Sequence, residues 1–194
     1  RIDFWSLAIS VAESGASTFR ECLAEDELRR AEGFAASEDA RTFSIARGFL
    51  RHVLAGYCDA SPADIRFGVG RFGKPFVLTA PARLEFNLSH SSEAVVIAVA
   101  LERELGIDLE RRNREWESIY RRVLPPGELE EMEKLETADR AEFFVRQWTR
   151  KEAAVKALGG ELRLLPRTTY PEDPSRTREW KALDVPGIQN HVCT

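Results

Sequence analysis

The sequence has few cysteines, no cysteine pair and no long apolar run. Its three cysteines, Cys22, Cys58 and Cys193, lie far apart, and none belongs to a Cys-x-x-Cys motif. This pattern argues against a disulfide framework and a zinc site, so we expect a protein of the reducing cytoplasm. No apolar stretch approaches the about 20 residues that span a bilayer, and no signal of charged then apolar residues opens the chain. We therefore expect no membrane partner.

An excess of positive charge is also missing. The formal net charge is −4 with 31% charged residues, so the chain lacks the basic field that drives binding to a phosphate backbone. A nucleic acid is thus not expected as its main partner. The chain does have 194 residues, of which 43% are hydrophobic, and this is enough for one large domain or two small ones, each with its own core.

Four segments of the sequence predict strands. Residues 2–11 are rich in aromatic and β-branched residues, and residues 84–88 form a shorter apolar segment after a glycine-rich stretch. The unbroken run AVVIAVAL at 94–101 predicts a strand that is buried on both faces. A hairpin turn at 102–104 and a short strand at 105–110 would follow it.

Two long helices are predicted, one in each half of the chain. Over residues 37–58 apolar side chains recur at helical spacing, and Arg41, Arg47 and Arg51 lie off that stripe. The second helix covers about 137–158 and is followed by the stop signal Gly159-Gly160. Short surface helices are expected within 111–136, and loops with one or two weak strands within 167–187.

Each half of the sequence therefore contributes strands and one long helix. No repeat is visible letter by letter. The shared content nevertheless predicts an α+β fold of two similar lobes, residues 1–101 and residues 102–194.

A pair of carboxylates is placed on one side of the predicted strand at 105–110. Because side chains alternate along a strand, Asp108 and Glu110 share one face and Ile107 and Leu109 share the other. Two adjacent carboxylates repel unless a cation neutralises them, and oxygen ligands suit Mg²⁺. A solvated strand face with Arg111 and Arg112 as casual partners is the alternative interpretation.

The second long helix carries an acid in an unexpected place. Glu152 falls within the apolar stripe of that helix, where a carboxylate is costly unless it is paired or bound to a metal. Lys156 follows one turn later, so a simple pair of Glu152 with Lys156 is one explanation. The functional interpretation makes Glu152 a metal ligand or base and Lys156 a cation for a phosphate.

Several residues of the N-terminal half have the composition of an anion site. A strand-like segment ends in Asn87-Leu88-Ser89-His90-Ser91-Ser92, which is typical of an anion-binding turn. Lys74 is presented between Gly73 and Pro75, and Arg41 and Thr42 lie where a helix start would favour a phosphate. A structural histidine, a surface lysine and an ordinary basic helix start are the alternatives. A hydrolase that uses Ser89 and His90 is also open, although the Gly-x-Ser-x-Gly elbow is absent.

Three motifs occur in order along the chain. They are Gly73-Lys74-Pro75 followed by Phe86-Asn87-Leu88-Ser89-His90-Ser91, then Gly106-Ile107-Asp108-Leu109-Glu110, then Trp148-Thr149-Arg150-Lys151-Glu152-Ala153 with Lys156. Together, at these separations, they resemble the motifs of the Sfp-type 4′-phosphopantetheinyl transferases. The resemblance covers about residues 34–165. Beyond Leu165 the sequence departs from the family's pattern, so the second lobe is expected to be short or incomplete.

The resemblance implies a pseudo-dimer of two α+β lobes that holds coenzyme A and Mg²⁺ in the cleft between them. It makes Asp108, Glu110 and Glu152 the metal ligands, and Glu152 and Lys156 the catalytic residues. The implied coenzyme A contacts are Arg41, Thr42, Arg47, Lys74, Pro75, Asn87, Ser89, His90, Asp108 and Lys156. We expect Glu152 to take the proton of the attacking serine.

The resemblance also implies the partner, an acyl, peptidyl or aryl carrier protein that accepts the phosphopantetheine arm. Such carriers are usually acidic, so Arg111, Arg112, Arg114, Arg121 and Arg122 are candidates for a docking face. A solvated helix balanced by Glu115 and Glu117 is the alternative. A monomer is expected, because two lobes in one chain can form the cleft. A coenzyme A or nucleotide-binding module without transferase activity is the alternative function.

Overall fold

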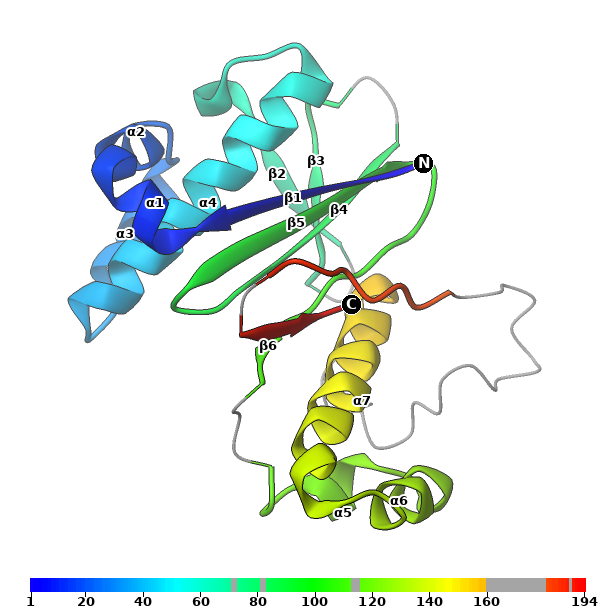
Figure 1. Cartoon of the computed structure of the whole chain (residues 1–194). Coiled ribbons are helices and arrows are strands. Elements are labelled where there is room, and N and C mark those ends of the chain that lie inside the picture. Colours follow the sequence, from blue (N-terminus) through cyan, green and yellow to red (C-terminus); the bar gives the residue numbers. More distant parts are fainter. Residues whose placement is uncertain (71–72, 81–82, 113–115, 160–180, 189) are drawn as a thin grey trace. The chain divides into compact units, whose positions relative to one another are not determined.

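A computed structural model describes residues 1–70, 73–80, 83–112, 116–159, 181–188 and 190–194 of the chain. They form two compact units, Arg1–Arg103 and Glu104–Thr194 (Figure 1). Each unit contains strands and one long helix, which confirms the predicted α+β class. The two units are described separately below.

The N-terminal unit is built on an antiparallel sheet in the order β1-β5-β4. The strands are β1 (Ile2–Ala8), β4 (Leu84–His90) and β5 (Ala94–Leu101). In the central strand β5, Ile97 pairs with Trp5 of β1 on one edge and with Leu88 of β4 on the other. Every residue of β5 from Ala94 to Ala100 is buried. The unbroken apolar run therefore predicted a central strand correctly.

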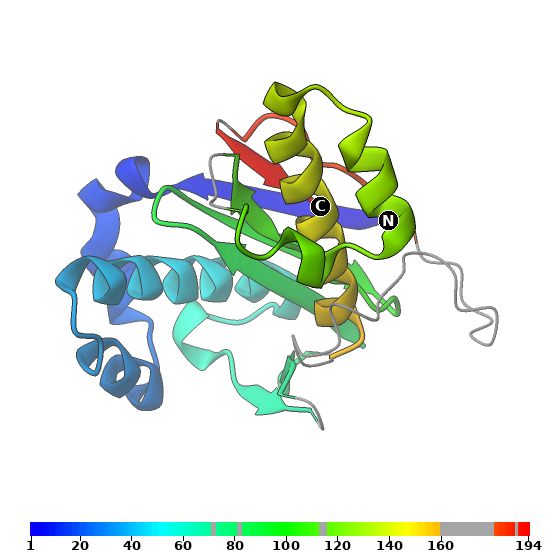
Figure 2. The same cartoon turned by 90° about the horizontal axis from the view of Figure 1, so that it is seen from below.

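The long helix α4 (Ser37–Cys58) lies along one face of this sheet (Figure 2). Its bounds are those that the apolar spacing predicts. The core between helix and sheet takes alternate residues from each strand, as the pleat requires. It is formed mainly by Ile45, Leu50, Leu54, Leu84, Phe86, Val95, Ile97 and Val99.

The segment after β1 differs from the prediction. Strand β1 ends at Ala8, not at residue 11, because the Ile9 N–H bonds to the Glu93 carbonyl and Ile9 and Ala12 turn into the core at helical spacing. Short helices follow that the sequence pattern did not reveal. They are α1 (Ile9–Ala12), η1 (Glu13–Gly15), α2 (Ala16–Glu21) and α3 (Glu25–Glu32). After α4 come a further short helix, η2 (Pro62–Asp64), and a hairpin of the strands β2 (Phe67–Val69) and β3 (Pro75–Val77).

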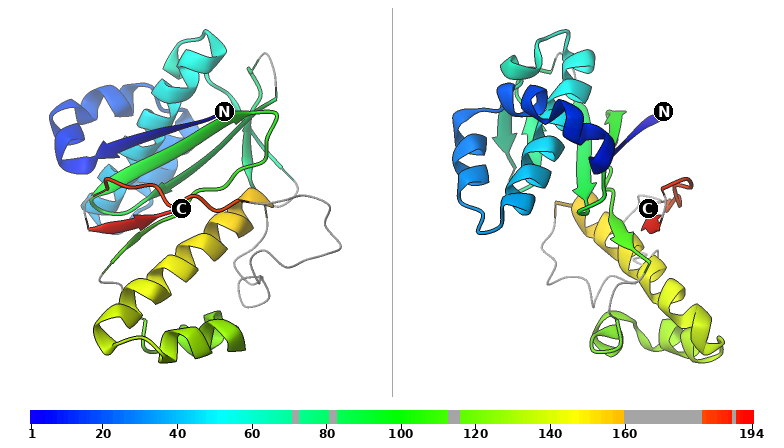
Figure 3. Two further views of the ribbon diagram at one scale, coloured as in Figure 1. Left: turned by 45° about the vertical axis from the view of Figure 1, so that its right-hand side comes forward. Right: turned by 60° about the vertical axis from the view of Figure 1, so that its left-hand side comes forward.

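The C-terminal unit places a long helix against a short two-stranded sheet. Strand β6 (Leu109–Arg111) pairs with β7 (His191–Cys193), and α5 (Tyr120–Val123) and α6 (Pro126–Glu133) lie beside the first half of α7 (Thr137–Ala157) (Figure 3). The core of this unit contains Val123, Leu124, Met132, Phe144, Val145 and Val192. The predicted second long helix is confirmed, and Gly159 follows its end with a φ of 66°. Gly160 lies outside the described residues.

Two predictions about this region are wrong. The strand expected at 105–110 pairs only from Asp108 onward, because its partner is the short β7 and not β5. The hairpin expected at 102–104 does not form, since β5 and β6 belong to different sheets and the Glu102 N–H bonds to the Arg83 carbonyl. The loops expected at 167–187 lie mostly outside the described residues, and 181–188 form neither helix nor strand. Within the described ranges no helix is both long and apolar enough to cross a bilayer.

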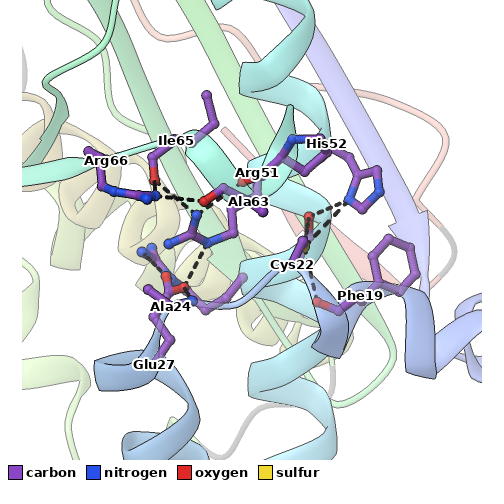
Figure 4. Close-up of polar contacts among 12 residues, drawn as sticks. Phe19, Cys22, Ala24, Glu27, Arg51, His52, Ala63, Ile65 and Arg66 are labelled. Carbon is purple, nitrogen blue, oxygen red and sulfur yellow. Dashed lines mark hydrogen bonds and ion pairs between the residues drawn. The ribbon is translucent and has the colours of Figure 1, made fainter. Parts of the chain in front are cut away.

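A buried ion network joins α3 to α4 in the N-terminal unit (Figure 4). The Arg51 Nε donates to Glu27 Oε2 at 2.7 Å, and its Nη1 donates to the carbonyls of Pro62 and Ile65. Only 2% of the Arg51 side chain is exposed. Arg47 donates to the other oxygen of Glu27, and its guanidinium lies 4.6 Å from the centre of the Phe67 ring. The helical spacing of apolar residues predicted that Arg51 lies outside the core. This prediction is wrong, because the carboxylate of Glu27 compensates the charge of Arg51 inside the core.

Replacing Glu27 by glutamine should destabilise the protein strongly. The substitution leaves the Arg51 guanidinium buried without an opposite charge, which costs about 3–5 kcal/mol of unfolding free energy. Urea denaturation followed by circular dichroism measures the loss. Glu32→Gln on the same helix is the matched control, because Glu32 is 66% exposed and lies 3.5 Å from Arg20. A surface pair of this kind contributes about 0–1 kcal/mol, and equal losses in both variants would contradict the buried role.

Candidate active site

Strand β6 and the residue before it present two carboxylates to the same side. Asp108 is 2% exposed, and its backbone pairs with Thr194 in both directions, at 2.8 and 3.1 Å. This pairing keeps the segment extended, so Asp108 and Glu110 point one way while Ile107 and Leu109 are buried on the other. The alternation derived from the sequence is thus present locally.

Helix α7 brings the third carboxylate to the same place. Glu152 is buried, and one oxygen from each of Asp108, Glu110 and Glu152 lies within 4.8 Å of the others. The donor set is made only of carboxylate oxygens, which is the chemistry that a hard divalent cation such as Mg²⁺ prefers. The residues of this cluster therefore fit the implied metal.

Two further side chains of α7 bind the carboxylates of β6. The Lys156 Nζ donates to Asp108 Oδ1 at 2.6 Å, and the Trp148 Nε1 donates to Glu110 Oε1 at 3.0 Å. Trp148, Glu152 and Lys156 are spaced by four residues, so they form one face of the helix. That face orients Glu110 and supplies a positive charge beside Asp108.

Gly106 allows the chain to reach this face of the helix. A Cβ at this position would lie 2.0 Å from the Ala153 carbonyl oxygen and 2.5 Å from the Ala157 nitrogen. Backbone atoms cannot move aside as a flexible side chain can. The glycine of the second motif is therefore required by close packing of the segment before Asp108 against α7.

The partner strand β7 contributes residues that the sequence pattern did not single out. Cys193 lies beside Asp108, and burial, helped by the negative charge of Asp108, raises the pKa of its thiol to about 12. The raised pKa favours the protonated thiol near neutral pH. No cysteine motif could have placed it here, because its neighbour is 85 residues earlier in the chain.

Asp184 holds the C-terminal segment to α7. Its carboxylate accepts from Arg146 and Arg150 of the helix and from the Thr194 hydroxyl. Burial alone would raise the pKa of Asp184, but the two arginines outweigh it and lower the pKa. Because Thr194 also pairs with the backbone of Asp108, the contacts of Asp184 support the segment that carries the carboxylates.

In the N-terminal unit, some of the residues expected to bind an anion share one face of the sheet. By strand alternation Glu85, Asn87 and Ser89 of β4 share the face opposite α4, and Lys74 reaches Glu85 at 3.2 Å. Asn87 and Ser89 are buried, whereas His90 is exposed at the end of the strand and belongs to the other face by alternation. Pro75 begins β3 next to Lys74.

The cations expected at the first long helix already have carboxylate partners. Arg41 lies 3.4 Å from Glu13, and Arg47 pairs with Glu27. The helix begins at Ser37, so Arg41 and Thr42 are one turn inside it, and Thr42 is buried. The argument that these two residues meet a helix start is wrong, and the first turn instead carries Glu38 and Asp39.

Two of the arginines proposed for carrier docking face carboxylates within the described residues. Arg112 forms an ion pair with Glu142 at 2.5 Å, and Arg121 lies 3.9 Å from Glu133. Arg122 is exposed in α5, and Arg111 ends β6. Arg114 and Glu115 lie outside the described residues.

Comparison with known proteins identifies the family of the chain. Residues 104–190 match the model of the 4′-phosphopantetheinyl transferase superfamily, and residues 12–102 match that of the N-terminal part of a 4′-phosphopantetheinyl transferase. HetI, a 4′-phosphopantetheinyl transferase of Nostoc sp., is 33% identical over 98% of this chain and 85% of its own length. The chain belongs to the 4′-phosphopantetheinyl transferase family. A 4′-phosphopantetheinyl transferase of Bacillus subtilis is 30% identical over 72% of this chain and 61% of its own length. The transferase Sfp of Bacillus subtilis strain 168 is 25% identical over 75% of this chain and 64% of its own length.

Membership of the 4′-phosphopantetheinyl transferase family confirms the resemblance found in the motifs. The two family models divide the chain between residues 102 and 104, close to the boundary after Arg103 between the two compact units. The carboxylate cluster lies wholly within the part matched by the superfamily model, and Lys74, Ser89 and His90 lie within the part matched by the N-terminal model.

Replacing Gly106 by alanine should disrupt the carboxylate cluster. The new methyl group would overlap the backbone of α7, and overpacking of this kind costs about 1–3 kcal/mol or more. We expect a lower melting temperature and weaker Mn²⁺ binding by calorimetry. Gly127→Ala is the matched control, because nothing lies within 4 Å of its added Cβ. Wild-type Mn²⁺ affinity in Gly106→Ala would contradict the packing argument.

Proposed function

We propose that the chain transfers the 4′-phosphopantetheine arm of coenzyme A to a serine of a carrier protein in a Mg²⁺-dependent reaction. The observation that carries the proposal is the cluster of Asp108, Glu110 and Glu152, with one oxygen of each within 4.8 Å, in a member of this transferase family. When bound there, Mg²⁺ supplies Lewis-acid stabilisation of negative charge on the pyrophosphate. Asp108, Glu110 and Glu152 would hold it.

The chain's own residues have distinct tasks in this reaction. The carrier serine oxygen bonds to the phosphorus next to the pantetheine arm, and the bond from that phosphorus to the bridging oxygen breaks. Adenosine 3′,5′-bisphosphate leaves with the electron pair of that bond. Glu152 takes the serine proton, because its carboxylate can act as a base and is shielded from solvent.

Lys156 is assigned to the transferred phosphate. Its ammonium donates to Asp108, and its side chain is 28% exposed, so that solvent and a bound ligand can reach it. It can therefore keep Asp108 in place and also donate to a phosphate oxygen. Trp148 has a supporting task, since its indole N–H fixes one oxygen of Glu110.

The coenzyme A contacts of the N-terminal unit are proposed residue by residue. Lys74, Asn87 and Ser89 are proposed together, because Asn87 and Ser89 share one face of β4 with Glu85, the residue that pairs with Lys74. Pro75 and His90 flank this region. Arg41 and Thr42 have weaker support, because the helix begins one turn before them, at Ser37. Arg47 is proposed as a further contact.

The carrier is proposed to be an acyl, peptidyl or aryl carrier domain, and the enzyme a cytoplasmic monomer. Arg121 and Arg122 of α5 remain candidates for a docking face. Two alternatives are less well supported. A coenzyme A-binding module would not need three clustered carboxylates, and a hydrolase that uses Ser89 would need an accessible nucleophile, whereas Ser89 is 7% exposed.

Transfer is tested by incubating the protein with coenzyme A, Mg²⁺ and a panel of apo-carrier domains. Mass spectrometry should show one added phosphopantetheine arm on at least one carrier, and chromatography an equal amount of adenosine 3′,5′-bisphosphate. Chelation with EDTA, or a carrier whose acceptor serine is alanine, should abolish both products. Coenzyme A binding without any arm transferred across the panel would favour the binding module.

Glu152→Gln should lower kcat by about 100-fold or more, because general base catalysis contributes about 10²–10⁴-fold. Glutamine keeps the shape and one oxygen donor but cannot take a proton. Initial rates with saturating coenzyme A and carrier measure the effect, with Glu131→Gln on the exposed side of α6 as control. Near-normal turnover in Glu152→Gln would refute its assignment as the base.

A further inference from the structure

The third motif contains a second lysine, Lys151, that the proposed reaction does not use. Its side chain is only 1% exposed, and its Nζ donates to Glu128 Oε1 at 2.7 Å. A lysine ammonium is rarely buried, because removing it from water is costly unless an opposite charge compensates. The contact with Glu128 supplies that charge.

Lys151 and Glu152 are adjacent in sequence but point to different sides of α7. Successive helical residues are about 100° apart. Glu152 shares its face with Trp148 and Lys156, whereas Lys151 lies on the side of Phe144, whose neighbours in the core come from α5 and α6. Lys156 extends to Asp108 and Lys151 extends to Glu128, so the two lysines of the motif have different partners.

Glu128 is suited to hold this lysine. It is the third residue of α6, which begins at Pro126, and a carboxylate in the first turn of a helix is favoured by the helix dipole. Its other oxygen, Oε2, is buried and has no hydrogen-bond partner within the described part of the chain. The bond to Lys151 is therefore the contact that compensates the Glu128 charge and joins the start of α6 to α7.

The N-terminal unit contains the same arrangement. Glu27 is the third residue of α3 and Arg51 is 14 residues after the start of α4, just as Glu128 is the third residue of α6 and Lys151 is 14 residues after the start of α7. In both units a short helix is joined to the long helix by a buried ion pair. The recurrence at equivalent positions indicates a structural device and argues against a contact of Lys151 with coenzyme A.

We infer that Lys151 is a positioning residue, which acts through Glu128 to fix the rotation of α7 and so holds Glu152 in the carboxylate cluster. An apolar contact tolerates rotation of one helix on another, whereas an ion pair has one favoured geometry. A side-chain tip about 6 Å from the helix axis moves by about 1 Å when the helix rotates by about 10°. A shift of about 1 Å is enough to impair a site of this kind.

This inference rests on the proposed function, and its test therefore includes metal binding without turnover. The variants are Lys151→Met, Glu128→Gln and the double variant. The controls are Glu130→Gln on the exposed side of α6 and Lys134→Met, an exposed residue just after α6. Mn²⁺ affinity is measured by calorimetry, and kcat and the KM for coenzyme A are measured with an accepted carrier. Circular dichroism and thermal melting show whether each variant is folded.

Each single variant should weaken Mn²⁺ affinity and lower kcat by about 10-fold or more, the range found when residues that support metal ligands are changed. The KM for coenzyme A should stay within about twofold. The double variant leaves no buried charge unpaired, so it should fold, but it lacks the ion pair that fixes α7. Its Mn²⁺ affinity should therefore stay about 10-fold or more below that of the wild type, which keeps the test decisive if a single variant fails to fold.

Two results would overturn the inference. A large rise in the KM for coenzyme A in Lys151→Met and in the double variant, with Glu128→Gln unchanged, would make Lys151 a coenzyme A ligand. If every folded variant had a lower melting temperature but wild-type Mn²⁺ affinity, the pair of Lys151 and Glu128 would contribute only to stability and not to the position of Glu152. If the wild-type protein binds Mn²⁺ but modifies no carrier, the proposed function fails while the binding data still decide the role of Lys151.

Discussion

Mutual repulsion of three carboxylates is the constraint around which the C-terminal unit is organised. Asp108, Glu110 and Glu152 have oxygens within 4.8 Å of one another, in surroundings that shield Asp108 and Glu152 from water. Such a group is unfavourable unless positive charge and hydrogen-bond donors compensate it. Lys156 and the Trp148 indole provide part of this compensation, and a divalent cation would provide the rest. The energy needed to assemble the cluster would therefore favour the binding of a divalent cation there.

The elements around the cluster can be understood as the means of holding it together. Strand β7 keeps the backbone at Asp108 extended, and Asp184 ties the segment before β7 to α7 through Arg146 and Arg150. Gly106 brings the strand within backbone contact of α7. Each of these contacts joins segments that are far apart in sequence, so the site depends on the packed unit rather than on any single motif.

Sequence periodicity predicted the features that depend only on residues close together along the chain. The spacing of apolar residues located both long helices, and alternation placed Asp108 and Glu110 together, because these rules concern neighbours along the chain. They could not show that β6 pairs with His191–Cys193, a three-residue strand that has no pattern of its own. They also misplaced Arg51, because a charged side chain off the apolar stripe is buried only when a distant partner, here Glu27, is present. The short helices between β1 and α4 were missed for the related reason that they are too short to show a period.

The buried pairs of the two units show what the sequence conceals. Glu27 with Arg51 and Glu128 with Lys151 occupy equivalent positions of a short and a long helix, yet no repeat is visible in the letters. The cation is an arginine in one unit and a lysine in the other, but in both it meets a carboxylate at the start of the short helix. What differs between the units is the next residue of the long helix, which is His52 in one and Glu152 in the other. The same way of joining helices is thus used in both units, and only in the C-terminal unit does the neighbouring position place a carboxylate in the cluster with Asp108 and Glu110.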